Sequence, residues 1–308
     1  MNVFVGGPTT VVKDGEIYML AGIYVNTKDY TRHEVDADDE DDEDDEDDED
    51  DEAPYRGLLL VKGNVIDGDT DKRIYWNDTD GLPYTFLNQH HRHLGGLTGG
   101  GGSGVKMSDG TLVFPVEATK FDEEFIKQSF CLIIHSSTDN KNWTLSKGIS
   151  DGGCSVPSVV EWKDNQLMMM TAFDDGRRRV YESGDKGESW TEALGTLSRV
   201  WGNKQGGSGV RSGFITATIE ERNVMLVTLP VYLDFEKGGN GKDELHLWLT
   251  DNTHIVDIGP VSGDDDVAAS SLLYNSETKE LIALYENKKG SEEASLGMVS
   301  VLLTDELE

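Results

Sequence analysis

A strand–turn–strand pattern that recurs about every 56 residues most constrains how this chain can fold. The tight turns are centred near residues 110, 165, 222 and 278, with strand-forming residues on both sides of each turn. A fifth unit precedes them, in which Asp14-Gly15 separates Thr9–Val12 from Glu16–Ile23. Asp-Gly favours the two-residue turn of a β-hairpin. Strand-rich units at such a period are typical of propeller blades, so we predict an all-β propeller of about five blades.

The segment Ser183–Trp190 has the form S-x-D-x-G-x-S-W and predicts a hairpin loop between two strands. Serine and aspartate side chains accept hydrogen bonds from backbone amides in such loops. Gly187 tolerates a positive φ, and Trp190 closes the loop by packing against the sheet. Ser137–Trp143 is a shorter version that lacks the glycine and ends 47 residues earlier. Two such loops about one blade apart support the propeller prediction.

The negative charge of the chain is distributed unevenly. The formal net charge is −32, and 16 of the 17 residues from Asp36 to Glu52 are acidic. Adjacent carboxylates repel one another and have no apolar face to bury, so we predict an exposed, disordered insertion at 36–52. The acidic balance argues against nucleic acid and anionic membranes as partners. No apolar run is long enough to span a bilayer, and the first residues do not form a signal peptide, so we expect no membrane insertion by this chain.

Three other features indicate structure more than chemistry. Gly95–Gly104 lacks the Lys-Ser/Thr ending of a phosphate-binding loop and predicts a place where backbones approach closely. The histidines of Gln89–His93 match no strong zinc spacing, so we expect a polar loop and no metal site. Cys131 and Cys154 are the only two cysteines, and the sequence leaves open whether they pair or remain buried thiols.

Seven segments of the chain carry specific motifs: Gly7–Thr9, Gly102–Val105, Asp109–Phe114, Cys154–Trp162, Asp174–Trp190, Leu194–Gly202 and Leu247–Asn252. Together they resemble the trans-sialidase superfamily of trypanosome surface proteins. The resemblance covers nearly the whole chain outside the acidic insertion, and its motifs are specific. It implies a six-bladed propeller followed by a lectin-like β-sandwich, of which residues 1–308 would be a partial propeller without the first blade and without the lectin-like domain.

The resemblance also implies exo-α-sialidase or trans-sialidase chemistry on terminal sialic acids. The anomeric carbon of the substrate carries a carboxylate, and sialidases use a tyrosine nucleophile in place of a second carboxylate. In the family a glutamate takes the phenolic proton and an aspartate protonates the leaving oxygen. Three arginines hold the substrate carboxylate, whose geometry matches the guanidinium fork. The resemblance implies no cofactor.

Four positions of this chain resemble functional positions of the family. Glu161 resembles the general base and Arg177 the second carboxylate-binding arginine, with a solvated strand end and an ordinary surface charge as the alternatives. Tyr30 matches an aromatic residue near the acceptor sugar, with a plain strand tyrosine as the alternative. Lys242 stands where the third arginine belongs, and a lysine keeps the positive charge but loses the bidentate fork.

Departures from the family pattern remove most of this chemistry. Ala269 aligns with the nucleophilic tyrosine, Gly7 with the acid aspartate and Asn240 with a tryptophan that stacks on the acceptor, while the first arginine would precede Met1. We therefore expect a catalytically inactive adhesion protein that binds sialylated glycans or host-cell surface glycoproteins. Residual sialidase or trans-sialidase activity and a non-functional fragment are the alternatives. We expect a monomer that, by family resemblance, is secreted or at the cell surface, although the chain shows no signal peptide or anchor signal.

Overall fold

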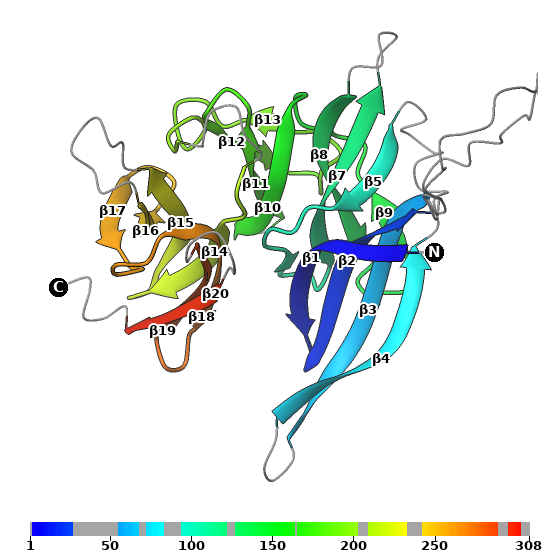
Figure 1. Cartoon of the computed structure of the whole chain (residues 1–308), viewed down its shortest axis with the longest axis horizontal. Helices are drawn as coiled ribbons and strands as arrows, with labels where there is room; N and C mark the ends of the chain where they lie inside the picture. The colour runs from blue at the N-terminus through cyan, green and yellow to red at the C-terminus, as the bar shows by residue number, and fades with distance from the viewer. Residues whose placement is uncertain are drawn as a thin grey trace, which may run out of the picture.

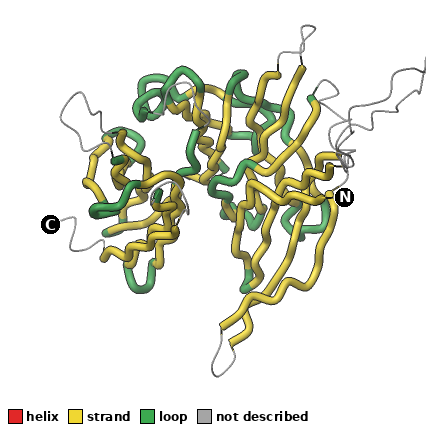
Figure 2. The backbone as a smooth tube through the Cα atoms, viewed as in Figure 1, coloured by secondary structure: helices red, strands yellow, loops and turns green. Residues whose placement is uncertain are grey.

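The computed structural model describes residues 2–26, 55–67, 72–82, 94–121, 127–163, 165–202, 209–232, 242–288 and 295–302. In these ranges every regular element is a β-strand, and no helix is long and apolar enough to cross a membrane. The strands form five antiparallel sheets, each built from strands that follow one another in the sequence (Figures 1 and 2). The all-β, five-blade prediction is confirmed.

We number these sheets as blades 1 to 5 in chain order. Blade 1 contains β1 (Asn2–Lys13), β2 (Glu16–Asn26), β3 (Tyr55–Asp67) and β4 (Lys72–Leu82). Blade 2 contains β5 (Gly95–Gly99), β6 (Val105–Lys106), β7 (Leu112–Phe121), β8 (Lys127–Ser136) and β9 (Trp143–Leu145). Blade 3 contains β10 (Cys154–Lys163), β11 (Gln166–Phe173), β12 (Arg178–Ser183) and β13 (Thr191–Glu192). Blade 4 contains β14 (Gly213–Ile219), β15 (Arg222–Tyr232), β16 (Asp243–Thr250) and β17 (Ile255–Pro260). Blade 5 contains β18 (Val267–Asn275), β19 (Glu280–Asn287) and β20 (Ser295–Leu302).

The five hairpin units read from the sequence are the inner hairpins of the five blades. Between β1 and β2, Asp14 and Gly15 have φ values of 54° and 82°. Two consecutive positive φ values define the turn that matches the twist of paired strands, and Asp-Gly is the sequence that tolerates them. The strand pairing on either side continues from Lys13↔Glu16 to Asn2↔Asn26, with one irregularity. Local turn chemistry therefore sets the register of blade 1.

Both hairpin loops expected from the tryptophan motifs are present, each between the last two strands of its blade. In Ser183–Trp190 the Asp185 carboxylate accepts hydrogen bonds from the Ser189 amide at 2.9 Å and the Ser189 hydroxyl at 2.6 Å. The Gly187 amide donates to the Ser183 hydroxyl at 2.8 Å, and Gly187 has φ 81°. Trp190 packs on the apolar cluster shared by blades 2 and 3. The motif is a folding element, as the sequence indicated.

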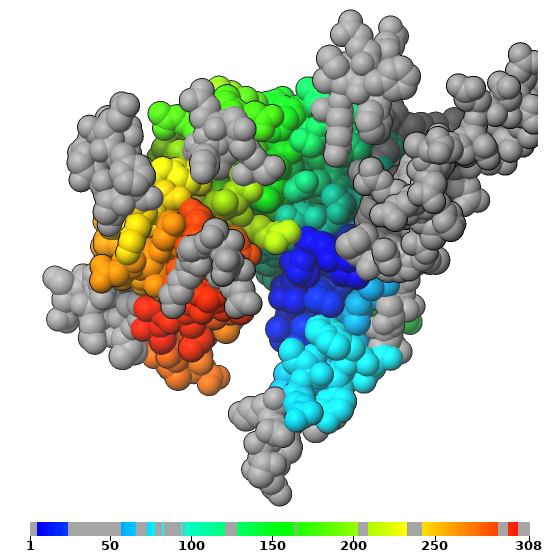
Figure 3. Space-filling model, viewed as in Figure 1, coloured from blue at the N-terminus to red at the C-terminus, as the bar shows by residue number. Residues whose placement is uncertain are grey.

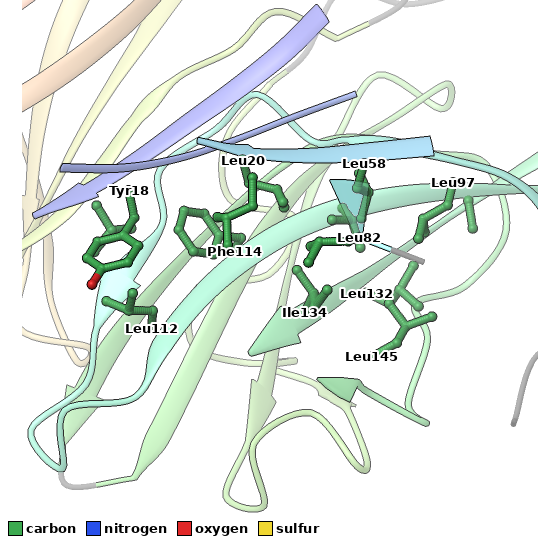
Figure 4. Packing of buried hydrophobic residues seen from close by; sticks show 14 of the residues in the cluster. Tyr18, Leu20, Leu58, Leu82, Leu97, Leu112, Phe114, Leu132, Ile134 and Leu145 are labelled. Carbon is green, nitrogen blue, oxygen red and sulfur yellow. The ribbon is translucent and has the colours of Figure 1, made fainter. Parts of the chain in front are cut away.

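The core lies between neighbouring blades, because alternate side chains of one strand point to opposite faces of its sheet. On β11, Leu167 and Met169 pack toward blade 2, whereas Met168 and Met170 pack toward blade 4. A strand buried on both faces in this way reads as a continuous apolar run. Figure 4 shows the corresponding layer between blades 1 and 2, where Leu20 and Phe114 meet.

Blades 1 and 5 differ from the inner blades because each has one face that no other blade covers. The open face of blade 5 carries Leu273, Leu284 and Leu296, which are 62%, 49% and 86% exposed. Across from it, blade 1 presents Ile74 and Trp76, which are 47% and 43% exposed. In Figure 3 the space between these faces is a deep notch between the red and the blue and cyan surfaces. We call this space the open wedge.

A disulfide between Cys131 and Cys154 joins β8 of blade 2 to β10 of blade 3, with a Cα–Cα distance of 6.0 Å. Both cysteines are fully buried in the apolar cluster between the two blades. The structure therefore shows that Cys131 and Cys154 pair, a question that the sequence left open.

Reduction of this disulfide should destabilise the chain by about 3 kcal/mol, because the two cysteines are 23 residues apart and the cross-link restricts the unfolded chain. Urea unfolding of the oxidised and the reduced protein measures the difference. The double variant Cys131→Ala/Cys154→Ala is the control, since reductant should leave its midpoint unchanged. An equal midpoint for the oxidised and reduced wild-type protein would contradict this assignment.

The open wedge should bind hydrophobic dyes, because contiguous exposed apolar surface of this kind is uncommon on soluble domains. We expect Leu273→Glu/Leu296→Lys to reduce the fluorescence of bound 8-anilinonaphthalene-1-sulfonate by about half, with the strand content of the circular dichroism spectrum unchanged. Val256→Lys, an exposed apolar position on β17 outside the wedge, should leave the signal unchanged. Equal signals from the wild-type protein and the double variant would show that the dye binds elsewhere.

Candidate functional site

A chain of buried hydroxyl groups links the inner strands of successive blades. Thr9 on β1 donates its hydroxyl to the Gly102 carbonyl of blade 2 at 2.8 Å. The Ser103 amide donates to the Ser158 hydroxyl of blade 3 at 3.2 Å, and that hydroxyl donates to the Ser212 carbonyl at the entry to blade 4 at 3.4 Å. Each donor or acceptor hydroxyl is paired, which is the condition for burying polar groups near the axis of a propeller. We call this set the axial hydroxyl chain.

The axial hydroxyl chain continues into blade 5 through β15 and β18. The Thr228 and Ser270 hydroxyls are 2.9 Å apart, and both residues are buried. The Ser270 amide donates to the Arg211 carbonyl at 2.9 Å, and the Gly213 amide donates to the Thr228 hydroxyl at 3.2 Å. These contacts place the first half of β18 directly against Arg211–Gly213, the segment that leads into blade 4.

The glycine-rich segment fits this axis only because it lacks side chains. A Cβ on Gly102 would collide with the Pro157 carbonyl and the Ser158 hydroxyl, and a Cβ on Gly100 would lie 2.9 Å from the Pro115 carbonyl oxygen. The expected close approach of backbones is therefore confirmed. The glycines let blade 2 reach blades 3 and 4 at the axis.

A cleft of about 720 Å³ opens beside the axial hydroxyl chain, at the inner end of the open wedge. Its walls come from β1 and β4 on one side and from β18, β19 and β20 on the other, and the glycine-rich segment and Arg211–Ser212 contribute to its lining. Most of the lining is apolar, with Val12, Leu273 and Leu284 among the contributors. Among the described residues of the lining, Arg211 is the only cation and Glu286 the only carboxylate.

Ala269, the position aligned with the nucleophile, lies on the wall of this cleft next to Ser270. One tyrosine, Tyr285, is also among the described lining residues, but its side chain is 7% exposed and its hydroxyl donates to the Asp265 carboxylate at 2.8 Å. Burial, together with this carboxylate, raises the pKa of Tyr285 to about 12. The phenol therefore stays protonated at neutral pH and is a poor nucleophile.

Gly7, the position aligned with the acid, has φ 60°, and a Cβ there would collide with the Gly99 carbonyl of β5. Blades 1 and 2 are packed so closely at this point that an aspartate does not fit without a backbone shift. The structure thus gives a steric reason for glycine at this position.

Glu161 lies at the end of blade 3 where β10 turns into β11. Its carboxylate accepts hydrogen bonds from the Ser108 amide at 2.7 Å, the Ser108 hydroxyl at 2.9 Å and the Asn165 amide at 3.0 Å. These bonds join the β6–β7 turn of blade 2 to the β10–β11 turn of blade 3. In this structure Glu161 is a connection between two turns.

Arg177 lies at the opposite end of blade 3, where its side chain is exposed and its amide donates to Asp175 at 3.0 Å. Glu161 pairs with Leu167 at one end of β11, and Arg178 pairs with Ala172 near the other end. Five residues of extended strand span about 16 Å. The structure therefore does not bring Glu161 and Arg177 into one site.

The other two candidate residues also lie outside the cleft lining or outside the described ranges. Lys242 is exposed before β16 and donates to the Asp264 carbonyl at 2.7 Å. Tyr30 and Asn240 lie outside the described residues, as do the acidic insertion at 36–52 and the histidines of 90–93. In the part of the chain that the structure describes, no group of three or more metal-ligating residues is close enough to hold a metal ion.

Arg178 and Arg211 were not singled out as site residues by the sequence, yet both lie near the axial hydroxyl chain. Arg178 is 1% exposed, and burial lowers the pKa of its guanidinium to about 10. It donates to the Val210 carbonyl at 2.7 Å and to the Ser212 hydroxyl at 3.4 Å. Arg178 therefore positions the segment that carries Arg211. Arg177, Arg178 and Arg179 are consecutive, and only the alternation of side chains along β12 determines that Arg178 is the buried one.

Comparison with known proteins identifies several relatives. Residues 1–286 match the model of a BNR repeat-like domain. A sialidase of Trypanosoma cruzi is 38% identical over 287 residues, which are 91% of this chain and 22% of that protein. Sialidase 85-1.1 of the same organism is 34% identical, over 87% of this chain and 34% of that protein. The structure of Trypanosoma rangeli sialidase in complex with sialic acid matches 98% of this chain and 45% of its own, with 32% identity and a TM-score of 0.75.

The steric account of position 7 predicts that Gly7→Asp destabilises the protein by roughly 2–4 kcal/mol, because the new side chain meets the Gly99 carbonyl and the backbone keeps a positive φ. Gly6→Asp is the matched control, since no heavy atom lies within 4 Å of a Cβ built there. Its effect should stay within about 0.5 kcal/mol. Chemical denaturation measures both, and equal effects for the two variants would refute the steric account.

Proposed function

Because this chain belongs to the sialidase and trans-sialidase superfamily, we propose that it binds sialylated glycans without cleaving or transferring sialic acid. The chain spans 22% and 34% of the length of the two trypanosomal relatives compared above, so the activities of those proteins are not attributed to this chain. The proposal rests on the residues around the cleft.

The observation that carries the proposal is Ala269 on the cleft wall. A methyl group cannot form the covalent intermediate that a tyrosine nucleophile provides, and removal of a nucleophile costs several orders of magnitude in turnover. The neighbouring Tyr285 is held protonated by Asp265 and does not replace it. Glu161, the residue that resembles the base, is hydrogen-bonded to Ser108 and Asn165 at the β10–β11 turn and is not among the described lining residues of the cleft.

We further propose that the protein acts as an adhesion protein at the cell surface or after secretion, with host-cell surface glycoproteins as partners. The Cys131–Cys154 disulfide supports this location, since such bonds persist in oxidising compartments and are rare in the cytosol. The fit to a solved sialidase with bound sialic acid supports the ligand class. The acidic balance of the chain makes an anionic membrane surface an unfavourable partner.

We expect the purified protein to bind surfaces that carry α-linked sialic acid and to lose this binding after enzymatic removal of the sugar. In parallel, 3′-sialyllactose incubated with the protein should release no sialic acid above the buffer blank and transfer none to lactose. Chromatographic quantification of free and transferred sialic acid is the measurement, with an active sialidase as the positive control.

Two results would overturn the proposal. Release or transfer of sialic acid at a rate proportional to protein concentration would show a working enzyme. Binding that persists unchanged after desialylation would show that sialic acid is not the recognised group.

A further inference from the structure

Arg211 is the cation that the cleft presents to a ligand. It precedes β14, and its carbonyl accepts the Ser270 amide at 2.9 Å, so it lies beside Ala269 and the head of β18. Its side chain lies across Gly101 of the glycine-rich segment, where a Cβ would meet Arg211 Nε and would lie 2.9 Å from Cζ. Gly101 has φ 71°, a backbone conformation that residues with side chains rarely adopt. Because glycine also has no side chain, this position leaves room for the guanidinium of Arg211.

The guanidinium of Arg211 has no hydrogen-bond or ion-pair partner among the described residues. Its Nε atom is buried without an acceptor, and the Glu286 carboxylate on the cleft wall forms no bond with it. Arg178, the first residue of β12, is by contrast held through its two terminal nitrogens by the Val210 carbonyl and the Ser212 hydroxyl, although its Nε atom also has no partner among the described residues. A partly buried charge without a partner is costly, and an anion that reaches it recovers much of that cost.

The surroundings of Arg211 indicate what kind of anion fits. Val11, Ile215 and Leu272 give the cleft apolar walls, whereas Thr10 and Ser271 place exposed hydroxyls on opposite walls. A planar guanidinium matches a carboxylate through two parallel hydrogen bonds, which a lysine cannot reproduce. A ligand that combines a carboxylate with hydroxyl groups and small apolar groups would satisfy all three features.

We propose that Arg211 binds the carboxylate of the acidic sugar in the cleft and so provides the charge recognition for which the sequence pointed to Arg177 and Lys242. This inference rests on the proposed function, because it names the residue through which a sialylated glycan is held. It requires no covalent step. Gly101 has a supporting role, since it makes the space in which the guanidinium lies.

The test compares the α-methyl glycoside of sialic acid with its carboxyl methyl ester, which has the same shape but lacks the negative charge. Ligand-observed NMR titrations give the dissociation constants for the wild-type protein, Arg211→Gln, Arg211→Lys and the control Arg222→Gln. Arg222 is an exposed arginine at the β14–β15 turn, away from the cleft. Thermal unfolding of each variant identifies any loss of folding.

For the acid, we expect Arg211→Gln to weaken binding at least about tenfold and Arg211→Lys by a smaller factor, because a charged lysine keeps attraction without the fork. Arg222→Gln should bind as the wild-type protein does. For the wild-type protein the ester should bind as weakly as the acid binds to Arg211→Gln. Arg211→Gln should bind the acid and the ester with equal dissociation constants, as expected if the guanidinium pairs directly with the carboxylate.

Failure of this inference and failure of the proposed function give different results. If the wild-type protein binds the acid and Arg211→Gln binds it equally well, Arg211 is not the anion-binding residue and the proposed function stands. If the wild-type protein binds neither compound, the proposed function fails. In that case phenylglyoxal labelling of Arg211, followed by peptide mass spectrometry, tests the anion site with benzoate as the probe. Protection of Arg211 but not Arg222 by benzoate would support the site, and equal labelling would overturn it.

Discussion

The buried hydroxyl groups along the axis are the interaction on which the rest of the structure depends. Thr9, Ser158 and Ser270 each join their inner strand to a neighbouring blade through hydrogen bonds of 2.8–3.4 Å. A buried hydroxyl without a partner costs about 1–3 kcal/mol, so the axis is stable only when adjacent blades keep their mutual position. The glycine-rich segment makes this possible, because any larger residue at Gly102 would separate blade 2 from blade 3.

Farther from the axis, apolar layers between neighbouring sheets hold the blades together. The inner blades are buried on both faces, as the alternation of Met168 and Met169 toward different neighbours shows. The Cys131–Cys154 disulfide reinforces one of these layers. Blades 1 and 5 obey the same alternation, and their uncovered faces line the two sides of the open wedge. The cleft therefore lies where the regular stacking of blades is interrupted, and its apolar walls have the composition of an interior layer.

Chemistry at this cleft follows from what the blades place there. Ala269 supplies no nucleophile, and Tyr285 is held protonated by burial and by Asp265. We propose that Arg211 provides charge recognition, since Arg178 donates to backbone and hydroxyl acceptors, whereas Arg211 lines the cleft and has no partner among the described residues. The described lining therefore combines a cation, hydroxyl groups and apolar walls, and this composition is the basis of the proposed binding role.

The amino-acid sequence by itself determined the local elements: the hairpins with turns such as Asp14-Gly15, the loop closed by Trp190, and the close approach at Gly95–Gly104. These depend on residues near one another in the chain, so pattern and turn chemistry suffice to predict them. Only the tertiary structure decided which charges share a site. It put Glu161 at one end of blade 3 and brought Arg211 to the head of β18, because those distances depend on how separate blades stack.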